Sequence, residues 1–482
     1  MSLSPFVSSA LCLAVVGLLG GCANVRPPST EAQAAPASWY APNLPHQGAT
    51  QDLARWWGRF NDPLLVELIA HAQRLSPDVA SARAQVFAAR AALAGAEQLG
   101  RPQLDGVLSA GRGFTDPTVP VATTLSAGVQ ASWALALWGE EGVRVAAAQA
   151  REDAASAGWH QARVLVAAEV AQRYFGWRLC GDQLAVARAD SGSRQRTADA
   201  LGTTEKAGLT APAVAALARA SAAESAGRLV QARESCERQL KALVALSGRN
   251  EDQLRQDLAA SSAWRVPLDG LLEVPAVPAD VLRQRPDVYQ AQRQWVAAAQ
   301  DVGLAEAALR PSLRLSGSLM VNHVRAAGVS ATVDTWSLGP LTLSLPLLGR
   351  ERLQASAAAA RAQYEAAGSA YAATVRRAVS EVEQVLLGLD ALQGQTRAAE
   401  AALAGYRQSL AGTEARHGAG LAPLTELEEA RRVLLAAETT AVSLRQAWLT
   451  AWVQLYVALG GGFEPGTAAT EALQPLVVRD AS

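Results

Sequence analysis

The residues with the most distinctive chemistry in this chain are its four cysteines, Cys12, Cys22, Cys180 and Cys236. Residues 11–19 form a short apolar run, which is typical of a signal peptide and too short to span a bilayer. The run ends in Leu19-Gly20-Gly21-Cys22, a pattern similar to the bacterial lipobox, in which small residues precede the cysteine that receives the lipid. We therefore expect residues 1–21 to be a signal peptide and Cys22 to be lipidated.

The residue after Cys22 bears on where the protein is sorted. Ala23 is not an aspartate, so the aspartate retention signal is missing and sorting to the outer membrane is expected. Residues 1–10 contain no lysine or arginine, unlike the usual start of a signal peptide. The alternative is therefore an ordinary secretory signal or an uncleaved apolar start, with Cys22 incidental.

Cys180 and Cys236 are suited to form a disulfide, because they lie at equal sequence distances on either side of Gly208. If the chain reverses at Gly208 between two antiparallel helices, the two side chains lie side by side. An exported protein also enters an oxidising compartment, in which disulfides persist. The alternative is two buried thiols that face different neighbours, since disulfide geometry is demanding.

The sequence lacks the motifs of enzymatic, metal or nucleic-acid chemistry. The five histidines are scattered without the spacing of metal ligands: His46, His71, His160, His323 and His417. There is no HExxH, GxSxG or phosphate-loop motif. With 43 Lys+Arg against 44 Asp+Glu the net charge is −1, so nucleic acid is not an expected partner. We expect no enzyme, no cofactor and no metal.

The composition favours long, closely packed helices. Hydrophobic residues make up 50% of the chain but aromatic residues only 5%, so alanine and small aliphatic residues carry the apolar content. No proline occurs between Pro120 and Pro212. A continuous helix from Glu140 to Glu205 would measure about 100 Å at 1.5 Å per residue, which is longer than a compact globule needs.

Seven-residue apolar series in the second half predict coiled-coil seams. One series, with its interleaved positions, follows the long helix: Tyr364, Tyr371, Val375, Ala378, Val382, Val385, Leu389, Leu392, Ala399, Leu403, Tyr406 and Leu410. The other follows the returning helix: Leu427, Ala430, Leu434, Ala437, Ala441, Leu444, Trp448, Ala451 and Leu455. Gly208 and Gly420 are expected to reverse the chain, and Pro212 and Pro423 to stand near the starts of the returning helices.

The two halves of the chain carry the same landmarks in the same order. Arg101-Pro102-Gln103-Leu104 recurs as Arg310-Pro311-Ser312-Leu313, and further pairs follow at nearly the same offset. We predict a first repeat at 51–265 and a second at 266–465, each with a helix, two strands, a very long helix, a tight turn and a returning helix. Residues 22–50 are expected to be a lipidated extended segment and 466–482 a C-terminal tail.

The predicted strands alternate with a period of two, apolar on one face and small or polar on the other. The apolar positions are Leu125, Ala127, Val129, Ala131, Trp133, Leu135 and Leu137, then Leu313, Leu315, Leu319 and Val321, and finally Leu341, Leu343, Leu345 and Leu347. A bulge is expected at Gly339-Pro340. The pattern fits a membrane β-barrel wall with interfacial aromatic residues at Phe114, Trp133, Trp138 and Trp336. A soluble sandwich with one wet face is the alternative that the period leaves open.

Four strands per chain predict an assembly. An open sheet in lipid leaves unsatisfied edge groups that cost several kcal/mol each. Two copies would give eight strands, whose interior is filled by side chains. Three copies would give twelve strands and room for a channel, so a homotrimer is expected if the purpose is passage.

Several segments carry a resemblance to a known family: Trp56-Trp57-Gly58-Arg59-Phe60-Asn61-Asp62-Pro63-Leu64, Arg83-Ala84-Gln85-Val86, Ser132-Trp133-Ala134-Leu135-Ala136-Leu137-Trp138-Gly139, Asp280-Val281-Leu282-Arg283-Gln284-Arg285-Pro286-Asp287-Val288 and Leu455-Tyr456-Val457-Ala458-Leu459-Gly460-Gly461-Gly462. From Cys22 to Gly462 the chain resembles outer-membrane efflux factors of the TolC/OprM type, in the lipoprotein (NodT-like) branch. It departs from the family at Ala134 and Ala136, where acidic residues are common, and at Phe463, where tryptophan is usual.

The resemblance implies a mixed α/β membrane protein, mainly α-helical, with an internal duplication. In such a fold a trimeric twelve-stranded β-barrel, with four strands from each chain and outer-membrane lipid around it, continues into an α-helical coiled-coil periplasmic tunnel. The resemblance further implies passive conduction of substrates that an inner-membrane pump, usually of the resistance-nodulation-division class, delivers through a periplasmic adaptor. The alternative is a structural outer-membrane lipoprotein with a periplasmic coiled coil and no transport role.

The resemblance also implies roles for the helical tips, where the family's adaptor docks. The matching residues are Gly208, Leu209, Thr210, Gly420, Leu421 and Ala422; the alternative is that these are only turn residues. In the family, charged networks near the tips hold the entrance shut. Gate candidates near the second tip, beside His417, are Glu414, Arg416, Glu426 and Glu429, with a solvated helix end as the alternative.

Overall fold

The computed structural model describes residues 24–30, 56–58, 60–113, 121–261, 282 and 285–464. Cys22 and Phe114 lie outside these described residues. The chain divides into two compact units, each of which is described by itself. Unit 1 comprises Met1–Gln33, Ala84–Ser156 and Gln290–Ala373, and unit 2 comprises Ala34–Arg83, Ala157–Tyr289 and Thr374–Ser482. Each unit therefore draws on both of the repeats that the sequence predicts.

The order of elements repeats, as the sequence predicts. The first half contains α2 (Pro63–Leu75), α3 (Pro77–Gln98), β1 (Gln103–Gly113), β2 (Ala122–Leu135), α4 (Glu140–Lys206), α5 (Pro212–Ser247) and α6 (Glu251–Ala260). The second half contains α8 (Pro286–Ala307), β3 (Ser312–Ala326), β4 (Val329–Ser344), α9 (Arg350–Gly418) and α10 (Leu424–Ala458). The paired helices α3 and α8 both have 22 residues, and α4 and α9 have 67 and 69. The duplication is thus a property of the fold.

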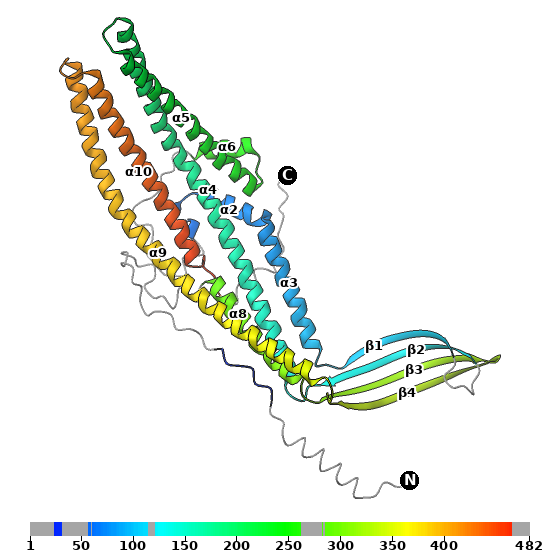
Figure 1. The fold of residues 1–482 in the computed structure, drawn as a ribbon. Helices are drawn as coiled ribbons and strands as arrows, with labels where there is room; N and C mark the ends of the chain where they lie inside the picture. Colours follow the sequence, from blue (N-terminus) through cyan, green and yellow to red (C-terminus); the bar gives the residue numbers. More distant parts are fainter. Residues whose placement is uncertain are drawn as a thin grey trace. The chain divides into compact units, whose positions relative to one another are not determined.

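Unit 1 contains one antiparallel sheet with the strand order β1-β2-β3-β4 (Figure 1). Its two faces differ in chemistry, because the register places the apolar positions of neighbouring strands on one face and the small or polar positions on the other. One face carries small and polar side chains such as Ser126, Gln130 and Ser318, and the other carries the leucines. Among the residues that the structure describes, β1 and β4 each have one edge without a partner strand.

A bulge keeps the leucine face continuous. The register shifts between the pairs Leu315–Leu341 and Gly317–Leu338, so that Gly339 and Pro340 oppose a single residue of β3. Gly339 has a φ of 111°, a conformation that glycine adopts readily. Because of the extra residue, Leu338 and Leu341 share a face although their sequence positions differ in parity. The bulge predicted at Gly339-Pro340 is confirmed.

The predicted strand ends are wrong at two places. Leu137 lies beyond the end of β2, and Leu345 and Leu347 lie beyond the end of β4 at Ser344. The register explains the second error, because β3 begins at Ser312, opposite Ser344, and offers no ladder partner further along. Pro346 also has no backbone N–H to donate to a ladder.

The helices confirm the seam predictions. Helix α4 runs from Glu140 to Lys206 without interruption, and α5 begins at Pro212. The seven-residue series of α9 is buried or half-buried, with Ala378 and Val382 fully buried, except that Tyr406 is 42% exposed. Among the described residues, no helix combines the length and apolar character that a membrane crossing requires.

A polar cluster in unit 2 ties α4 to α6 and to the residue before α2. The guanidinium of Arg178 pairs with Asp62 at 3.2 Å and donates to the carbonyls of Leu258 and Ser261 at 3.2 and 3.1 Å. The hydroxyl of Tyr174 donates to Asp62. Burial, together with this hydrogen bond, raises the pKa of Tyr174, so the phenol keeps its proton at neutral pH.

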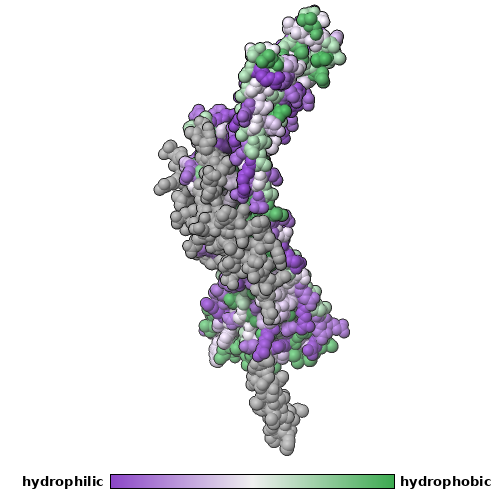
Figure 2. All heavy atoms as spheres, turned by 90° about the vertical axis from the view of Figure 1, so that its left-hand side faces the viewer, coloured by the Kyte–Doolittle hydropathy of each residue, from purple (hydrophilic) through white to green (hydrophobic). Residues whose placement is uncertain are grey.

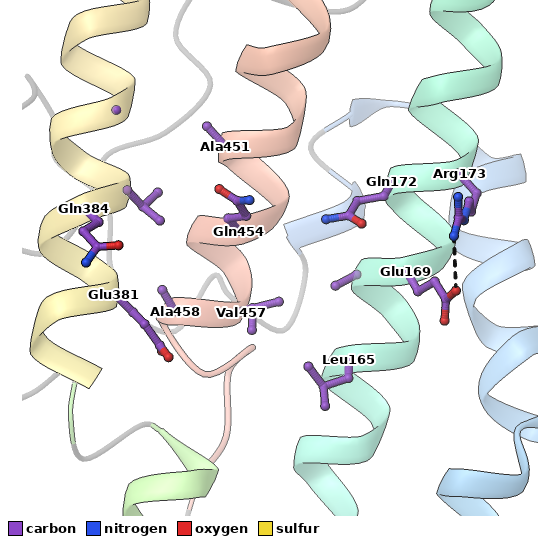
Figure 3. Close-up of a pocket in the computed structure, with 13 residues that line it drawn as sticks. Leu165, Glu169, Gln172, Arg173, Glu381, Gln384, Ala451, Gln454, Val457 and Ala458 are labelled. Atoms are coloured by element: carbon purple, nitrogen blue, oxygen red, sulfur yellow. Dashed lines mark ion pairs between the residues drawn. The ribbon is translucent and has the colours of Figure 1, made fainter. Parts of the chain in front are cut away.

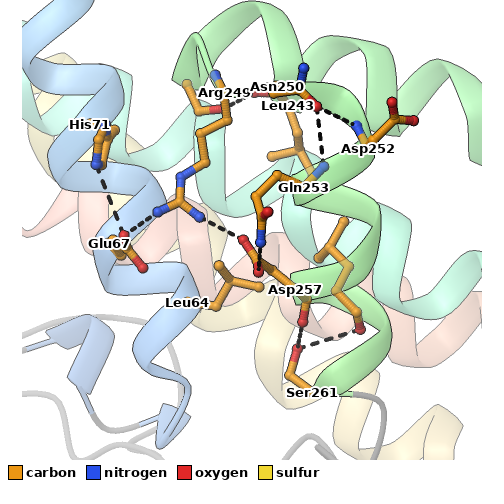
Figure 4. Close-up of polar contacts among 12 residues, drawn as sticks. Leu64, Glu67, His71, Leu243, Arg249, Asn250, Asp252, Gln253, Asp257 and Ser261 are labelled. Atoms are coloured by element: carbon orange, nitrogen blue, oxygen red, sulfur yellow. Dashed lines mark hydrogen bonds and ion pairs between the residues drawn. The ribbon is translucent and has the colours of Figure 1, made fainter. Parts of the chain in front are cut away.

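A second arginine joins α2 to α6 after the end of α5. Figure 4 shows the guanidinium of Arg249 between the carboxylates of Glu67 and Asp257; its Nη1 lies 2.9 Å from Asp257. Asn250 caps α6 by accepting hydrogen bonds from two backbone N–H groups of the first turn, at 2.9 and 3.2 Å. Burial and the nearby positive charges of Arg74 and Arg249 lower the pKa of His71, which faces Glu67 at 4.0 Å.

Candidate docking tips and charged network

The two helical hairpins of unit 2 end in turns of the same geometry. Gly208 and Gly420 both have a φ of 73°, the left-handed conformation that ends a helix. In the first tip the Gly208 N–H donates to the carbonyl of Glu205 at 2.9 Å, and the Leu209 N–H donates to that of Thr204 at 2.8 Å. The second tip has the same two distances, from Gly420 and Leu421. The repeat therefore places two equivalent reversals at one end of unit 2.

Each tip presents a leucine to solvent. Leu209 is 80% exposed and Leu421 is 71% exposed, whereas the residue after such a turn commonly packs back against its own helix. Figure 2 shows hydrophobic residues among hydrophilic ones at the end of the molecule where the tips lie. Two exposed leucines on equivalent turns are suited to burial against another protein.

The remaining predicted docking residues differ between the tips. Thr210 forms a hydrogen bond of 2.6 Å with the hydroxyl of Thr204. Ala422 is buried, and its carbonyl lies 2.8 Å from the Nδ1 of His417. Ala422 therefore belongs to the inside of its turn, and the exposed apolar group of the second tip is Leu421.

The structure gives each gate candidate a partner within the second hairpin. Arg416 pairs with Glu426 at 2.5 Å across the turn. Glu414 pairs with Arg431 at 3.1 Å, and Glu429 pairs with Arg432 at 2.5 Å. All four candidates are more than one-third exposed at the side chain, so each pair alone contributes little to stability.

Sequence reasoning missed the buried part of this network. Glu428 is 4% exposed; it pairs with Arg431 at 2.8 Å and accepts a hydrogen bond from Ser193 on α4. Burial opposes the charge of Arg431, but its hydrogen bonds with Glu414 and Glu428 outweigh this effect and raise its pKa. The sequence contains a signal for Glu428, because it begins a seven-residue series that is otherwise apolar: Leu435, Val442, Leu449 and Tyr456.

A groove with both polar and apolar side chains in its lining lies between α4, α9 and α10 in unit 2 (Figure 3). Its volume is about 770 Å³, and its polar side chains include Gln172, Gln384 and Gln454. Glu169 and Arg173 form an ion pair at 3.8 Å on the α4 side. The glutamines and the charged residues lie among small and aliphatic residues such as Ala168, Ala451 and Val457, so the lining is mixed in character.

Cys180 on α4 and Cys236 on α5 are joined as a disulfide, with 5.5 Å between their Cα atoms. The two cysteines thus lie side by side across the first hairpin, 56 residues apart in sequence. We predict that peptide mapping of the exported protein under non-reducing conditions recovers the two cysteine peptides linked. Replacing both cysteines with serine is expected to lower stability by about 2–4 kcal/mol without loss of fold. Recovery of both cysteines as free thiols in exported protein would contradict the prediction.

Comparisons with known proteins extend over nearly the whole chain. The model of a family described as outer membrane efflux protein matches residues 68–249 and 277–461. The chain is 30% identical to the outer membrane protein OprJ of Pseudomonas aeruginosa, over 96% of this chain and 97% of that protein. It is 29% identical to the pyoverdine export outer membrane protein OpmQ of Pseudomonas aeruginosa (93% and 95%), and 27% identical to nodulation protein T of Rhizobium leguminosarum bv. viciae (89% and 89%).

Solved structures show the same fold. The outer membrane protein VceC from Vibrio cholerae superposes with a TM-score of 0.70 at 25% identity, over 85% of this chain and 99% of that one. The Campylobacter jejuni CmeC outer membrane channel superposes with a TM-score of 0.74 at 22% identity, over 90% and 97%.

Proposed function

The chain belongs to the outer membrane efflux protein family, whose model matches most of its length, and we propose that three copies of it form one channel. Its function is that of the outer membrane channel component of a tripartite efflux system, with a periplasmic extension. The family consists of channels rather than enzymes. The observation that carries the proposal is the sheet, which has one face of exposed leucines, one polar face and, in the described part of the chain, two edges without a partner strand.

The open edges explain why copies must join. In lipid, the unpaired backbone groups of β1 and β4 would each cost several kcal/mol. Pairing β4 of one copy with β1 of the next satisfies both edges. Three copies give twelve strands, which leave an open interior lined by the polar face.

The tips support the proposal that a periplasmic adaptor docks there. Leu209 and Leu421 are exposed on turns of equal geometry, so three copies would present six equivalent leucines. An inner-membrane pump of the resistance-nodulation-division class would supply the energy, and the channel itself would conduct passively.

The charged groups near the second tip support the proposal of a gate. The ion pairs Arg416–Glu426 and Glu414–Arg431 connect α9 to α10 beside the turn. Glu428 of α10 also accepts a hydrogen bond from Ser193 of α4. Exchange of these partners between hairpins would change the width of the entrance. The alternative role is that of a solvated helix end that only stabilises the second hairpin.

The amino-terminal segment supports the proposal of a lipid anchor at Cys22. Residues 24–30 contact other segments of unit 1: the Val25 N–H donates to the carbonyl of Trp138 at 3.0 Å, and the Tyr364 hydroxyl donates to that of Ser29 at 2.6 Å. Trp138 follows β2 and precedes α4. Val25, three residues after Cys22, thus lies at the junction between the sheet and the helices. A lipid on Cys22 would therefore enter the same membrane as the barrel.

The proposed function is tested on outer-membrane fractions and in planar bilayers. We expect an oligomer that migrates as a trimer unless heated, an intact mass that includes acyl chains, and single-channel conductance from the purified trimer. A strain that lacks the gene is expected to become sensitive to exported compounds. A lipidated trimer that conducts nothing and leaves sensitivity unchanged would favour the structural lipoprotein instead.

A further inference from the structure

Two arginines lie in one cross-strand row at the hairpin end of the sheet. The register pairs Arg112 with Thr123, Thr123 with Arg325, and Arg325 with Ser330. Adjacent strands are about 4.8 Å apart, so the Cα atoms of the two arginines are separated by about 10 Å. The row lies at the end of the sheet opposite to the helices (Figure 1).

This row is on the leucine face. Directly opposed residues share a face and the pattern repeats every second residue, so apolar residues that the chain leaves exposed follow in the rows toward the helices, beside His323 and Thr332 in the first row and Asp334 in the second. The exposed apolar residues are Leu104, Leu108, Leu125, Val129, Trp133, Leu319, Val321, Trp336, Leu338, Leu341 and Leu343. The arginines therefore end a face that is mainly apolar.

The height of the apolar face places the arginines at its outer boundary. From Leu313 to Val321, the last apolar residue of this face on β3, the strand advances eight residues, or about 26 Å at 3.3 Å per residue. A strand tilted by about 40° rises about 20 Å over that length, which fits within the apolar band, about 25 Å tall, of outer-membrane barrels. Arg325 lies two rows beyond Val321, with His323 between them, and so lies at the edge of this band.

No acidic partner neutralises the row within the described part of the chain. Arg112 and Arg325 are exposed, and none of the ion pairs among described residues involves either guanidinium. His323 lies one row below and bonds Thr332 at 3.0 Å. Asp334, the acidic residue on this face of β4, pairs with Val321 and so lies two rows below Arg325.

We propose that Arg112 and Arg325 bind phosphate groups of an anionic lipid in the leaflet that faces away from the periplasm. The inference rests on the proposed barrel, because only then does the leucine face contact lipid. A guanidinium presents a planar fork that matches phosphate in a bidentate way. At a membrane boundary water is partly excluded, which strengthens this contact. Pairing β4 with β1 of the next copy would place an arginine on every second strand around the rim.

The test measures lipid retained by the purified trimer. The full chain is reconstituted in vesicles of phosphatidylcholine with a bisphosphorylated glycolipid, re-extracted, and weighed by native mass spectrometry. Each of Arg112→Gln and Arg325→Gln is expected to weaken glycolipid binding about five-fold, and the double variant about 25-fold. Arg314→Gln, on the polar face of the same strand β3, is the matched control and should retain the lipid.

Three results would overturn the proposal: full retention by the double glutamine variant, equal retention of the dephosphorylated glycolipid, or displacement of the lipid by millimolar inorganic phosphate. A double lysine variant keeps both positive charges but lacks the planar guanidinium fork. The amount of glycolipid that it retains should therefore fall between that of the wild type and that of the double glutamine variant. Conductance in phosphatidylcholine alone is measured in parallel. If the double glutamine variant loses the glycolipid while its conductance is unchanged, the result supports lipid binding by the arginines. Absence of conductance in the wild-type protein would instead contradict the proposed channel.

Discussion

Replacing Gly208 or Gly420 with aspartate is expected to abolish efflux while trimers still reach the outer membrane. A Cβ at either position meets nothing within 4 Å, so the substitution causes no clash. Both residues have a φ of 73°, so a side chain there costs about 1–2 kcal/mol, which a long hairpin tolerates. The new carboxylate stands next to Leu209 or Leu421, and docking of the adaptor would have to bury it unpaired. We expect export to fall at least about ten-fold.

Two further variants separate the causes. Gly420→Asn accepts the left-handed conformation with little strain and carries no charge, so it should keep most of the export activity. Gly394→Asp adds the same charge to α9 at a position where a Cβ also meets nothing within 4 Å, and it should be neutral. Export is read as tolerance of toxic compounds in a deletion strain, and assembly as the heat-modifiable trimer. Unchanged tolerance in both tip variants would reject the docking role.

The fold followed from the sequence wherever chain reversals and apolar periods are encoded locally. Glycine and proline mark the tips at Gly208, Pro212 and Gly420, and the long helix from Glu140 contains neither proline nor a β-turn. The strand from Val329 was only partly predicted, and its bulge is the reason. The apolar positions change parity at Gly339-Pro340, so a period-two pattern continued back from Leu341 places Trp336 and Leu338 on the wrong face of the sheet.

The candidate site was harder to predict because it depends on which helices meet. Arg416 and Glu426 flank one turn, so sequence proximity reveals them. Ser193 and Glu428 are far apart in the chain, and they meet only because α4 lies beside α10. The arginine row has the same origin: Arg112 and Arg325 come from different repeats, and only the register of β1, β2 and β3 brings them together. Periodicity gives the face of an element but not its neighbour.

Arg285→Ala is expected to cost about 3–5 kcal/mol of stability, the largest effect of any single substitution considered for unit 2. Arg285 is 3% exposed and precedes α8. Its guanidinium binds Asp287 at 3.0 and 2.7 Å, Glu381 of α9 at 2.7 Å and the carbonyl of Ala458 at the end of α10 at 2.9 Å. Burial opposes its charge, but the hydrogen bonds to Asp287 and Glu381 raise its pKa, so it stays ionised. Truncation removes the buried cation from Asp287 and Glu381 and leaves the carbonyl of Ala458 without this donor.

Arg377 provides a control that shares both partners. It lies 4.0 Å from Asp287 and 3.8 Å from Glu381, but its side chain is 62% exposed, so Arg377→Ala should cost less than about 1 kcal/mol. Thermal unfolding followed by helical circular dichroism distinguishes the two variants, and equal melting temperatures would contradict the assignment. Because Arg285 joins α8, α9 and α10 at one point, its loss should also weaken the trimer before the tips are affected. The heat-modifiable band of Arg285→Ala should therefore dissociate at a lower temperature than that of Gly420→Asp, since the tip variant leaves this junction intact.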